Sequence, residues 1–414
     1  MYQSAASMFK NKKVLILGFG REGMSTYRFL RNMYPDMHLT IADKNEIKLD
    51  DKNVTLICGD SYMDSLNDFD IVMKSPGIAF LDVDIKDGTL VTCQTDLFLK
   101  FAPCRKVGIT GSKGKTTTST LIYDMLKEGG FDARLIGNIG VPVLEDINTV
   151  TPETIAVIEM SSHQLEFTTS SPEVAVLTNI YEEHLDHYRD GFRGYVNAKL
   201  NIVRRQKEGD TFIYNATQGL DGLCDLGKIK SHKVGVKKDA PLPFAVNNEH
   251  LLGEHNRQDI LFAFEAAKHF GVDTAAAERA VEKFSGIEHR MEKVGTFRGI
   301  TFYNDCIATI PHAVECAVEA LKNVDTLIFG GMDRGLDYSE FENYLKKSNI
   351  KNLIGTPETG HKICDKIEGA PSKNVYKAAN LDEAVKKAYE VTAKGKICLL
   401  SPAASSYNCY NTFE

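Results

Sequence analysis

The sequence predicts an α/β protein of three domains built on parallel sheets. Short runs rich in Val, Ile and Leu alternate with longer helical patterns along almost the whole chain. This alternation is typical of parallel strands joined by crossover helices, with ligands bound in loops at the carboxyl ends of the strands. The pattern restarts at Lys106 and again at Thr326. We therefore predict domains at residues 1–100, 101–286 and 287–414.

The first domain opens with a strand and a glycine loop. We expect its elements as strands Lys13–Leu17, His38–Ala42 and Ile71–Met73 and a helix near Met24–Met33. The first strand ends in Gly18-Phe19-Gly20-Arg21-Glu22-Gly23, a GxGxxG pattern, and Asp43 follows at the end of the second strand. This spacing is that of a dinucleotide site, where the glycines let the backbone approach a diphosphate. Tight strand–helix packing without a nucleotide is the alternative.

The second domain opens with the strongest motif in the chain. A strand at Lys106–Thr110 runs into Gly111-Ser112-Lys113-Gly114-Lys115-Thr116-Thr117, after which a helix begins. Loop N–H groups and a helix N-terminus cradle phosphate oxygens, the lysine adds a point charge, and the threonine hydroxyl can reach Mg²⁺. The match to GxxxxGK[ST] is imperfect, because Ile109 stands at the first glycine. A strand–turn–helix whose glycines serve only the turn is the alternative.

Two phosphate-type loops in one chain limit the possible functions. A dehydrogenase explains the first loop and leaves Lys115 without a role. An enzyme that uses ATP on a nucleotide-linked substrate explains both loops.

Three further residues are candidates for the same site. A strand at Ile155–Glu159 delivers a carboxylate to its end, where Mg²⁺·ATP requires an oxygen ligand, although an exposed strand-end Glu is the alternative. His184 follows the next strand, Val174–Asn179, but a lone His is more often structural. Lys199 is indistinguishable from a solvated helical lysine, and an ammonium group repels Mg²⁺.

The third domain and the composition complete the prediction. A helix at Thr274–Lys283 precedes the boundary, and strands are expected at Thr326–Phe329 and Ile397–Leu400. The net charge of −7 argues against general nucleic-acid binding. No apolar run is long enough to cross a membrane, and the start indicates a buried strand, not a signal peptide. Nine Cys without a CxxC pair favour a reduced cytoplasmic protein, which we expect to be a monomer.

In order and spacing, the motifs of the whole chain resemble those of the Mur ligases. These enzymes are ATP-dependent amide-bond ligases of peptidoglycan precursor synthesis, and the branch that adds D-glutamate is the most similar. The motifs are GFGREG, SPGIA (75–79), GSKGKTT, GNIG (137–140), EMSSHQLE, TNIYEEHLDHY, NAKL, GEHNRQ (253–258), HRME (289–292), YND (303–305), GGMDRG (330–335) and LSPAASS (400–406).

The resemblance implies a Rossmann-like first domain that holds the UDP part of the substrate UDP-N-acetylmuramoyl-L-alanine. The residues concerned are Gly18, Gly20, Gly23, Asp43, Ser75 and Gly77. The first glycine loop would then bind a UDP diphosphate and not NAD. Asn138, Ser161 and Gln164 would face the muramoyl-alanine end.

The resemblance also implies an ATPase-like central domain with a phosphate loop. ATP would be bound by Gly111, Ser112, Lys113, Gly114, Lys115, Thr116 and Thr117, with Asn256 and Arg290 on the nucleotide and Asp305 on its ribose. Thr116 and Glu159 would bind one Mg²⁺, and His184 and Lys199 a second. Lys199 would be carbamylated by CO₂, which turns the repelling ammonium into an anion. The catalytic residues would be Lys115, Asn138, Glu159, His184 and Lys199.

The resemblance implies a Rossmann-like third domain that brings glutamate, most naturally the D form, through Arg334, Ser406 and Phe413. The substrate carboxylate would attack the γ-phosphate of ATP, and the amino group of glutamate would displace phosphate from the acyl phosphate. Three positions depart from the family pattern. Asp259 replaces the second Asn of HNxxN, Ile307 replaces a Lys, and Arg334 replaces a frequent Lys.

The alternatives stay open at this point. A related ligase could add another amino acid, and a folylpolyglutamate synthase is disfavoured because it lacks a first domain for UDP. An NAD-dependent dehydrogenase is favoured only by GFGREG and Asp43. A nucleotide-binding relative without catalysis is suggested by Asp259.

Overall fold

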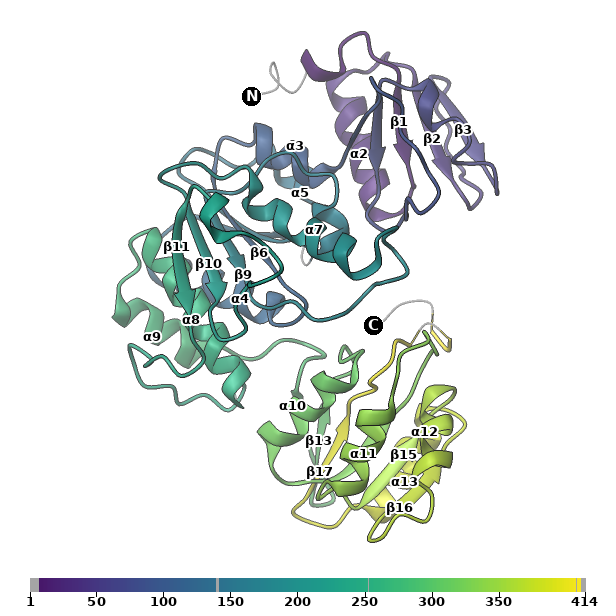
Figure 1. Cartoon of the computed structure of the whole chain (residues 1–414), viewed down its shortest axis with the longest axis vertical. Helices are drawn as coiled ribbons and strands as arrows, with labels where there is room; N and C mark the ends of the chain where they lie inside the picture. Colours follow the sequence, from purple (N-terminus) through teal and green to yellow (C-terminus); the bar gives the residue numbers. More distant parts are fainter. Residues whose placement is uncertain (1–6, 139–140, 252, 407, 411–414) are drawn as a thin grey trace. The chain divides into compact units, whose positions relative to one another are not determined.

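Three sheets follow one another along the chain in a computed structural model that describes residues 7–138, 141–251, 253–406 and 408–410 (Figure 1). Two of the sheets are parallel throughout, and the third is parallel except at one edge. The α/β class with three sheet-based parts is therefore confirmed.

The first sheet has the strand order β3-β2-β1-β4-β5. Its strands are β1 (Val14–Leu17), β2 (Leu39–Asp43), β3 (Val54–Cys58), β4 (Ile71–Lys74) and β5 (Leu90–Thr92), with helices α2 (Arg21–Met33), η1 (Leu66–Asp68) and α3 (Gln94–Phe101). The three predicted strands are confirmed, and the predicted helix begins three residues earlier. Because β1 pairs with both β2 and β4, the loops after these three strands meet at one edge.

The second sheet has the order β11-β10-β9-β6-β8-β7. Its strands are β6 (Arg105–Thr110), β7 (Ala133–Gly137), β8 (Ile155–Glu159), β9 (Val174–Leu177), β10 (Thr211–Asn215) and β11 (His232–Val236). The helices are α4 (Lys115–Glu128), α5 (Val143–Asp146), α6 (Ser162–Leu165), α7 (Gly191–Arg204), η2 (Leu226–Lys228), α8 (Gly253–His269) and α9 (Thr274–Lys283). Central β6 lies between β8 and β9, so the loops that follow these three strands converge.

The third sheet has the order β12-β13-β17-β14-β15-β16. Its strands are β12 (Glu292–Phe297), β13 (Ile300–Asn304), β14 (Val324–Phe329), β15 (Asn352–Gly355), β16 (Asn374–Lys377) and β17 (Ile397–Leu400). The helices are α10 (Pro311–Leu321), α11 (Ser339–Lys347), α12 (Thr359–Ile367) and α13 (Leu381–Val391).

One edge of the third sheet departs from the prediction of parallel strands. Strand β12 pairs antiparallel with β13. The two are joined by Arg298 and Gly299, both at positive φ (53° and 84°), as in a type I′ hairpin turn. Arginine is unusual at the first of these positions, so the sequence carries no strong hairpin signal there.

The chain divides into two compact units. One comprises residues 1–246 and 258–282, and the other comprises residues 247–257 and 283–414. The domain boundaries near residues 100 and 286 stay predictions.

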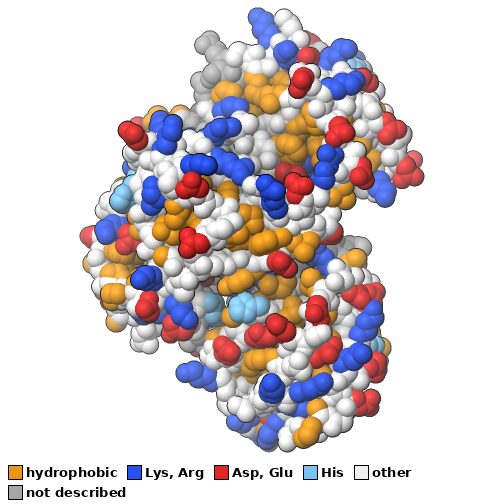
Figure 2. All heavy atoms as spheres, viewed as in Figure 1, with side chains coloured by type: hydrophobic (Ala, Val, Ile, Leu, Met, Phe, Trp, Pro, Cys, Tyr) orange, Lys and Arg blue, Asp and Glu red, His pale blue; other side chains and the backbone are white. Residues whose placement is uncertain are grey.

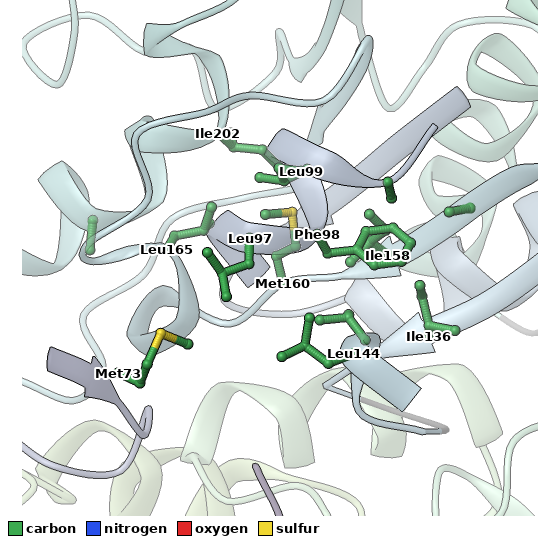
Figure 3. Packing of buried hydrophobic residues seen from close by; sticks show 14 of the residues in the cluster. Met73, Leu97, Phe98, Leu99, Ile136, Leu144, Ile158, Met160, Leu165 and Ile202 are labelled. Carbon is green, nitrogen blue, oxygen red and sulfur yellow. The ribbon is translucent and has the colours of Figure 1, made fainter. Parts of the chain in front are cut away.

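The first and second sheets share one hydrophobic core. Met73 of β4 belongs to the same buried cluster as Phe98 of α3, Ile158 of β8 and Leu165 of α6 (Figure 3). Strand β1 is buried on both faces, since Ile16 joins this cluster and Leu17 joins a second one, as expected for a parallel sheet covered on both sides.

The distribution of charged side chains on the surface agrees with the mild net charge of −7. On the face shown in Figure 2, basic and acidic side chains are interspersed. Within the described residues, every helix is too short or too polar to cross a membrane.

Candidate active site

A cavity of about 390 Å³ lies at the carboxyl edge of the first sheet. Its lining includes the predicted residues Gly18, Gly20, Asp43, Ser75 and Gly77, together with Arg21, Glu22, Lys44, Asn45, Tyr62, Pro76 and Ile78. Gly18 has φ 86°, and a Cβ there would lie 2.8 Å from the Ser75 side chain. The Ser75 hydroxyl donates to the Gly18 carbonyl at 3.0 Å. The two loops can approach this closely because residue 18 is glycine.

The polar groups of this cavity suit a diphosphate. Asp43 accepts hydrogen bonds from the backbone N–H groups of Phe19 (2.6 Å) and Asn45 (2.8 Å), which fixes the glycine loop against the end of β2. Arg21 and Lys44 add positive charge to the lining, and α2 begins at the cavity. A helix N-terminus with neighbouring cations attracts anionic phosphate.

The phosphate loop joins β6 to α4. Gly114 has φ 82° at the N-cap position, and Lys115 is the first helical residue. The Lys115 Nζ donates to the carbonyl oxygens of Gly111 (2.9 Å) and Ser112 (3.0 Å), so the ammonium group lies over its own loop. Thr116 follows in the first turn of α4. The predicted loop residues therefore form one continuous strand–loop–helix unit.

The segment after β9 holds this loop in shape. The Ser112 N–H donates to the Asn179 carbonyl at 2.9 Å, and the Lys113 N–H donates to the Asn179 side chain at 2.8 Å. The Thr178 hydroxyl donates to the Lys113 carbonyl at 2.6 Å. The motifs predict no role for Thr178 or Asn179, although these residues follow a strand that pairs with β6.

Glu159 is buried at the end of β8, with 1% of its surface exposed. One carboxylate oxygen accepts from the Asn138 side chain at 2.7 Å. Among the described residues no donor reaches the other oxygen, Oε2, which is also buried. Since buried polar atoms are nearly always paired, this oxygen is suited to a bound cation.

Lys199 is fully enclosed on α7, with 1% of its surface exposed. The interpretation of Lys199 as a solvated lysine is therefore wrong. Its Nζ donates to the Gly111 carbonyl at 2.8 Å. Burial, followed by the neighbouring charge of Lys115, lowers the pKa of Lys199 well below its ordinary value. The neutral amine is the form that reacts with CO₂.

His184 lies in a group of histidine rings. The ring of His163 lies 4.7 Å from that of His184 and 3.9 Å from that of His187, measured between centroids. Burial and these neighbours lower the pKa of His163 to about 2, so the ring is neutral. The sequence pattern predicts no role for His163 or His187, and the HLDH segment (184–187) has no typical zinc-ligand spacing.

The residues present fit Mg²⁺ only in combination with other oxygen ligands. Within the described part of the chain, no group of three or more His, Cys, Asp or Glu side chains could hold a metal ion. Mg²⁺ is commonly held by one or two carboxylates together with phosphate oxygens and waters. Glu159, the Thr116 hydroxyl and substrate phosphates match that type of site.

Ser161 and Gln164 connect this site to the first cavity. They form a capping box at the start of α6, two residues after Glu159. The Gln164 side chain also donates to Glu22 Oε1 at 2.8 Å. The two predicted substrate residues therefore lie between the first cavity and Glu159.

Asp259 lies against the phosphate loop. It accepts from the Thr118 hydroxyl at 3.3 Å, and a Cβ on Gly114 would lie 2.4 Å from its Oδ1. This carboxylate is 6% exposed. The departure from the family pattern thus places a carboxyl group beside the start of α4.

The other predicted nucleotide residues belong to the second compact unit. Asn256 is in the first turn of α8, and Arg290 precedes β12. Asp305 follows β13 and accepts from the Ser401 hydroxyl at 2.8 Å and from the Met291 N–H at 3.2 Å. These contacts join three of the C-terminal motifs.

The predicted amino-acid residues lie on neighbouring segments. The Met332 N–H donates to the Ser405 carbonyl at 2.7 Å, so the segments that carry Arg334 and Ser406 run side by side. Arg334 is exposed, while Ser406 lines a cavity of about 490 Å³ in this unit. Phe413 lies outside the described residues.

Comparisons with known proteins identify the family. The Mur ligase MurD-like N-terminal domain matches residues 12–91, the Mur ligase middle domain matches residues 109–264, and the Mur ligase glutamate ligase domain matches residues 289–404. A UDP-N-acetylmuramoylalanine–D-glutamate ligase of Ligilactobacillus salivarius is 33% identical over 98% of this chain and 94% of its own length. The chain belongs to the Mur ligase family.

Further Mur ligases agree in sequence and fold. A ligase of the same name from Clostridium kluyveri is 33% identical over 98% of this chain and 94% of its own length. Another, from Halalkalibacterium halodurans, is 32% identical over 98% of this chain and 95% of its own length. MurF of Thermotoga maritima, solved in complex with ADP, has a TM-score of 0.62 at 17% identity and covers 94% of this chain and 91% of its own. MurF of Acinetobacter baumannii has a TM-score of 0.63 at 16% identity, and the match covers 96% of this chain and 88% of that protein. These two structures support the fold alone.

Proposed function

We propose that this Mur ligase joins D-glutamate to UDP-N-acetylmuramoyl-L-alanine in peptidoglycan precursor synthesis, with conversion of ATP to ADP and phosphate. The observation that carries the proposal is the position of Lys115, Glu159 and Lys199 around one phosphate loop, with Gln164 leading from there to the UDP cavity. The relatives that cover nearly the whole chain carry the name of this reaction.

The UDP end of the substrate would bind in the cavity of the first sheet. Gly18, Gly20, Ser75 and Gly77 line this cavity and would contact the diphosphate. Gly23 does not line it, but a Cβ there would lie 1.9 Å from the Gly18 carbonyl oxygen, so this glycine lets α2 pack against the loop. Asp43 keeps the loop closed through the Phe19 N–H. Asn138, Ser161 and Gln164 would direct the muramoyl-alanine carboxylate towards the phosphate loop.

ATP would bind on residues 111–117, with its phosphates at the start of α4. Lys115 would leave the carbonyls that it contacts here and neutralise charge on the γ-phosphate. Asn256, Arg290 and Asp305 would hold the nucleoside. The substrate carboxylate then attacks the γ-phosphorus and ADP leaves, which gives an acyl phosphate. The amino group of glutamate attacks the acyl carbon, loses a proton and displaces phosphate.

One Mg²⁺ ion would be held by Thr116 and Glu159, and a second by His184 and a carbamylated Lys199. Both ions would neutralise phosphate charge. The unpaired Oε2 of Glu159 and the buried amine of Lys199 support this assignment. A carbamate would leave the Lys199 site with a negative charge, which offsets the nearby charge of Lys115. Asn138 would keep the Glu159 carboxylate in orientation.

Glutamate would be bound by the third domain. Arg334 offers a planar fork that matches a carboxylate, and Ser406 adds a neutral donor. Phe413 would complete this pocket. We further propose domains 1–100, 101–286 and 287–414 and a monomeric, cytoplasmic enzyme.

The test is a ligation assay with UDP-N-acetylmuramoyl-L-alanine, ATP·Mg²⁺ and one amino acid at a time. Product mass and ADP are measured with D-glutamate, L-glutamate, L-alanine and a diamino acid. We expect D-glutamate to be the best acceptor and Arg334→Leu to weaken its use. If L-glutamate is preferred, the stereochemistry is wrong. If L-alanine or the diamino acid is preferred, the assignment of the amino acid is wrong.

A further inference from the structure

A buried ion pair connects the wall of the UDP cavity to the segment that follows Glu159. Lys74 is the last residue of β4 and directly precedes Ser75 of the cavity lining. Its Nζ lies 3.2 Å from Oε2 of Glu166, the residue after α6. The side chains are 2% and 17% exposed. The two charges are thus paired almost out of reach of solvent, across 92 residues of sequence.

Two aromatic rings lie near the Lys74 ammonium group. The Lys74 Nζ lies 5.4 Å from the ring centroid of Phe80 and 5.3 Å from that of Phe167. In such surroundings the attraction between the charges is strong, and either charge left alone would be unfavourable. Separation of the Lys74 ammonium group from the Glu166 carboxylate is therefore unfavourable.

A second contact runs parallel to the ion pair. Gln164, two residues before Glu166, donates to Glu22 of the cavity lining at 2.8 Å. Met73 and Leu165, the neighbours of Lys74 and Glu166 in sequence, pack in the same buried cluster (Figure 3). The segment 161–166 is therefore held at two points to the walls of the cavity.

Glu166 also reaches the histidine group. Its Oε2 lies 3.4 Å from His187 Nε2. The backbone N–H of His187 donates to the His184 carbonyl at 3.1 Å. One carboxylate thus connects the UDP cavity, through Lys74, with the loop that carries His184.

We propose that Lys74 and Glu166 are positioning residues, which fix the UDP cavity relative to the Glu159–Gln164 segment so that the acyl end of the bound substrate meets the phosphate loop. This inference rests on the proposed function. A substrate held at one end gains reactivity only if its other end is placed correctly, and a displacement of about 1 Å can cost on the order of 10² in rate.

The test compares Lys74→Met and Glu166→Gln with the wild type. Affinity is measured for UDP alone and for UDP-N-acetylmuramoyl-L-alanine, and KM is measured for each of the three substrates. We expect UDP affinity to stay within twofold, while kcat/KM for the UDP-linked substrate falls at least tenfold. The KM values for ATP and D-glutamate should stay within twofold. Glu166→Asp, which keeps the charge, should recover part of the loss.

The matched control is Asp84→Ala. Asp84 pairs with Arg189 at 3.1 Å, nearly the same distance, but its side chain is 93% exposed. This variant should behave as the wild type. If a single variant does not fold, Lys74→Met/Glu166→Gln removes both charges together and should show the same selective loss.

Two results overturn the inference. One is unchanged kcat/KM for the UDP-linked substrate in the folded variants, and the other is a similar rise in the KM of all three substrates together with a lower melting temperature. Failure of the proposed function looks different, because the wild type itself would then form no amide. In that case the affinities for UDP and for UDP-N-acetylmuramoyl-L-alanine still test the inference. The variants should bind the whole substrate more weakly than the wild type and bind UDP equally well. A wild type that binds neither compound overturns both.

Discussion

Lys115 and Lys199 donate hydrogen bonds to the same acceptor, the Gly111 carbonyl oxygen, at 2.9 and 2.8 Å. Lys115 comes from the start of α4 and Lys199 from the middle of α7, so the fold brings two amines to one carbonyl. Their repulsion adds to burial in lowering the pKa of Lys199. An anionic phosphate on the loop and a carbamate on Lys199 would each reduce that repulsion.

Lys115→Ala should reduce ligation by on the order of 10²–10³ in rate, because it removes a main source of charge stabilisation on the γ-phosphate. The measurement is kcat of the folded variant. Lys127→Ala is the control, since Lys127 is exposed in the last turn of the same helix. Near-normal turnover of Lys115→Ala would contradict the assignment of the ATP site.

Lys199→Ala should be nearly inactive, and a small carboxylate such as acetate should restore part of the activity by replacing the carbamate. Mass spectrometry under CO₂ and native conditions should find one added carboxylate on the wild type and none on this variant. Full activity of Lys199→Arg would refute carbamylation, because a guanidinium group cannot form the carbamate.

Asp259→Asn should strengthen ATP binding roughly 3- to 10-fold, because loss of one like charge near the phosphates is worth on the order of 1 kcal/mol. The measurement is the equilibrium Kd for ATP. Without nucleotide the variant should melt slightly earlier, since the carboxylate lies near the start of α4, where negative charge is favourable. Weaker ATP binding by the variant would show that the carboxylate assists the nucleotide.

Much of the fold followed from local pattern. Strand Ile155–Glu159 is confirmed at both ends, and the phosphate loop lies between a strand and a helix as predicted. These features depend on neighbouring residues and on the rule that ligands bind at the carboxyl ends of parallel strands. The position of Glu159 in the candidate site could be predicted in the same way, because this residue ends a strand.

The contacts between distant segments could not be predicted in this way. Lys199 looks solvated in sequence because its neighbours on α7 are mixed, and only the packing of α7 near β6 encloses it. Asp259 and Thr118 are 141 residues apart, and Lys74 and Glu166 are 92 apart. Each pairing depends on tertiary structure, of which a single sequence carries no direct record.

Glu173 should make the stability of the chain depend on pH in acid. Burial opposes the shift, but hydrogen bonds from His269 and Arg105 lower the pKa of Glu173 to about 2. A carboxyl group whose folded pKa is depressed stabilises the fold above its unfolded pKa of about 4.3, and this stabilisation is lost as pH falls towards 2.

Glu173→Gln should therefore be less stable than the wild type at pH 7, and the difference should close between about pH 4.5 and 2. Since both Glu173 and Arg105 are partly exposed, the difference should be about 1 kcal/mol or less. Urea unfolding at several pH values measures it. A difference that stays constant with pH would contradict the assigned role of Glu173.

The central claim is that the phosphate loop activates the substrate carboxylate by phosphorylation. The most direct test uses UDP-N-acetylmuramoyl-L-alanine labelled with ¹⁸O in its alanyl carboxylate, together with ATP·Mg²⁺ and D-glutamate. One carboxylate oxygen stays on phosphorus when the amine displaces phosphate. We predict that each turnover releases one phosphate that contains one ¹⁸O atom and one amide that retains the other. Unlabelled phosphate formed together with the amide would contradict the claim.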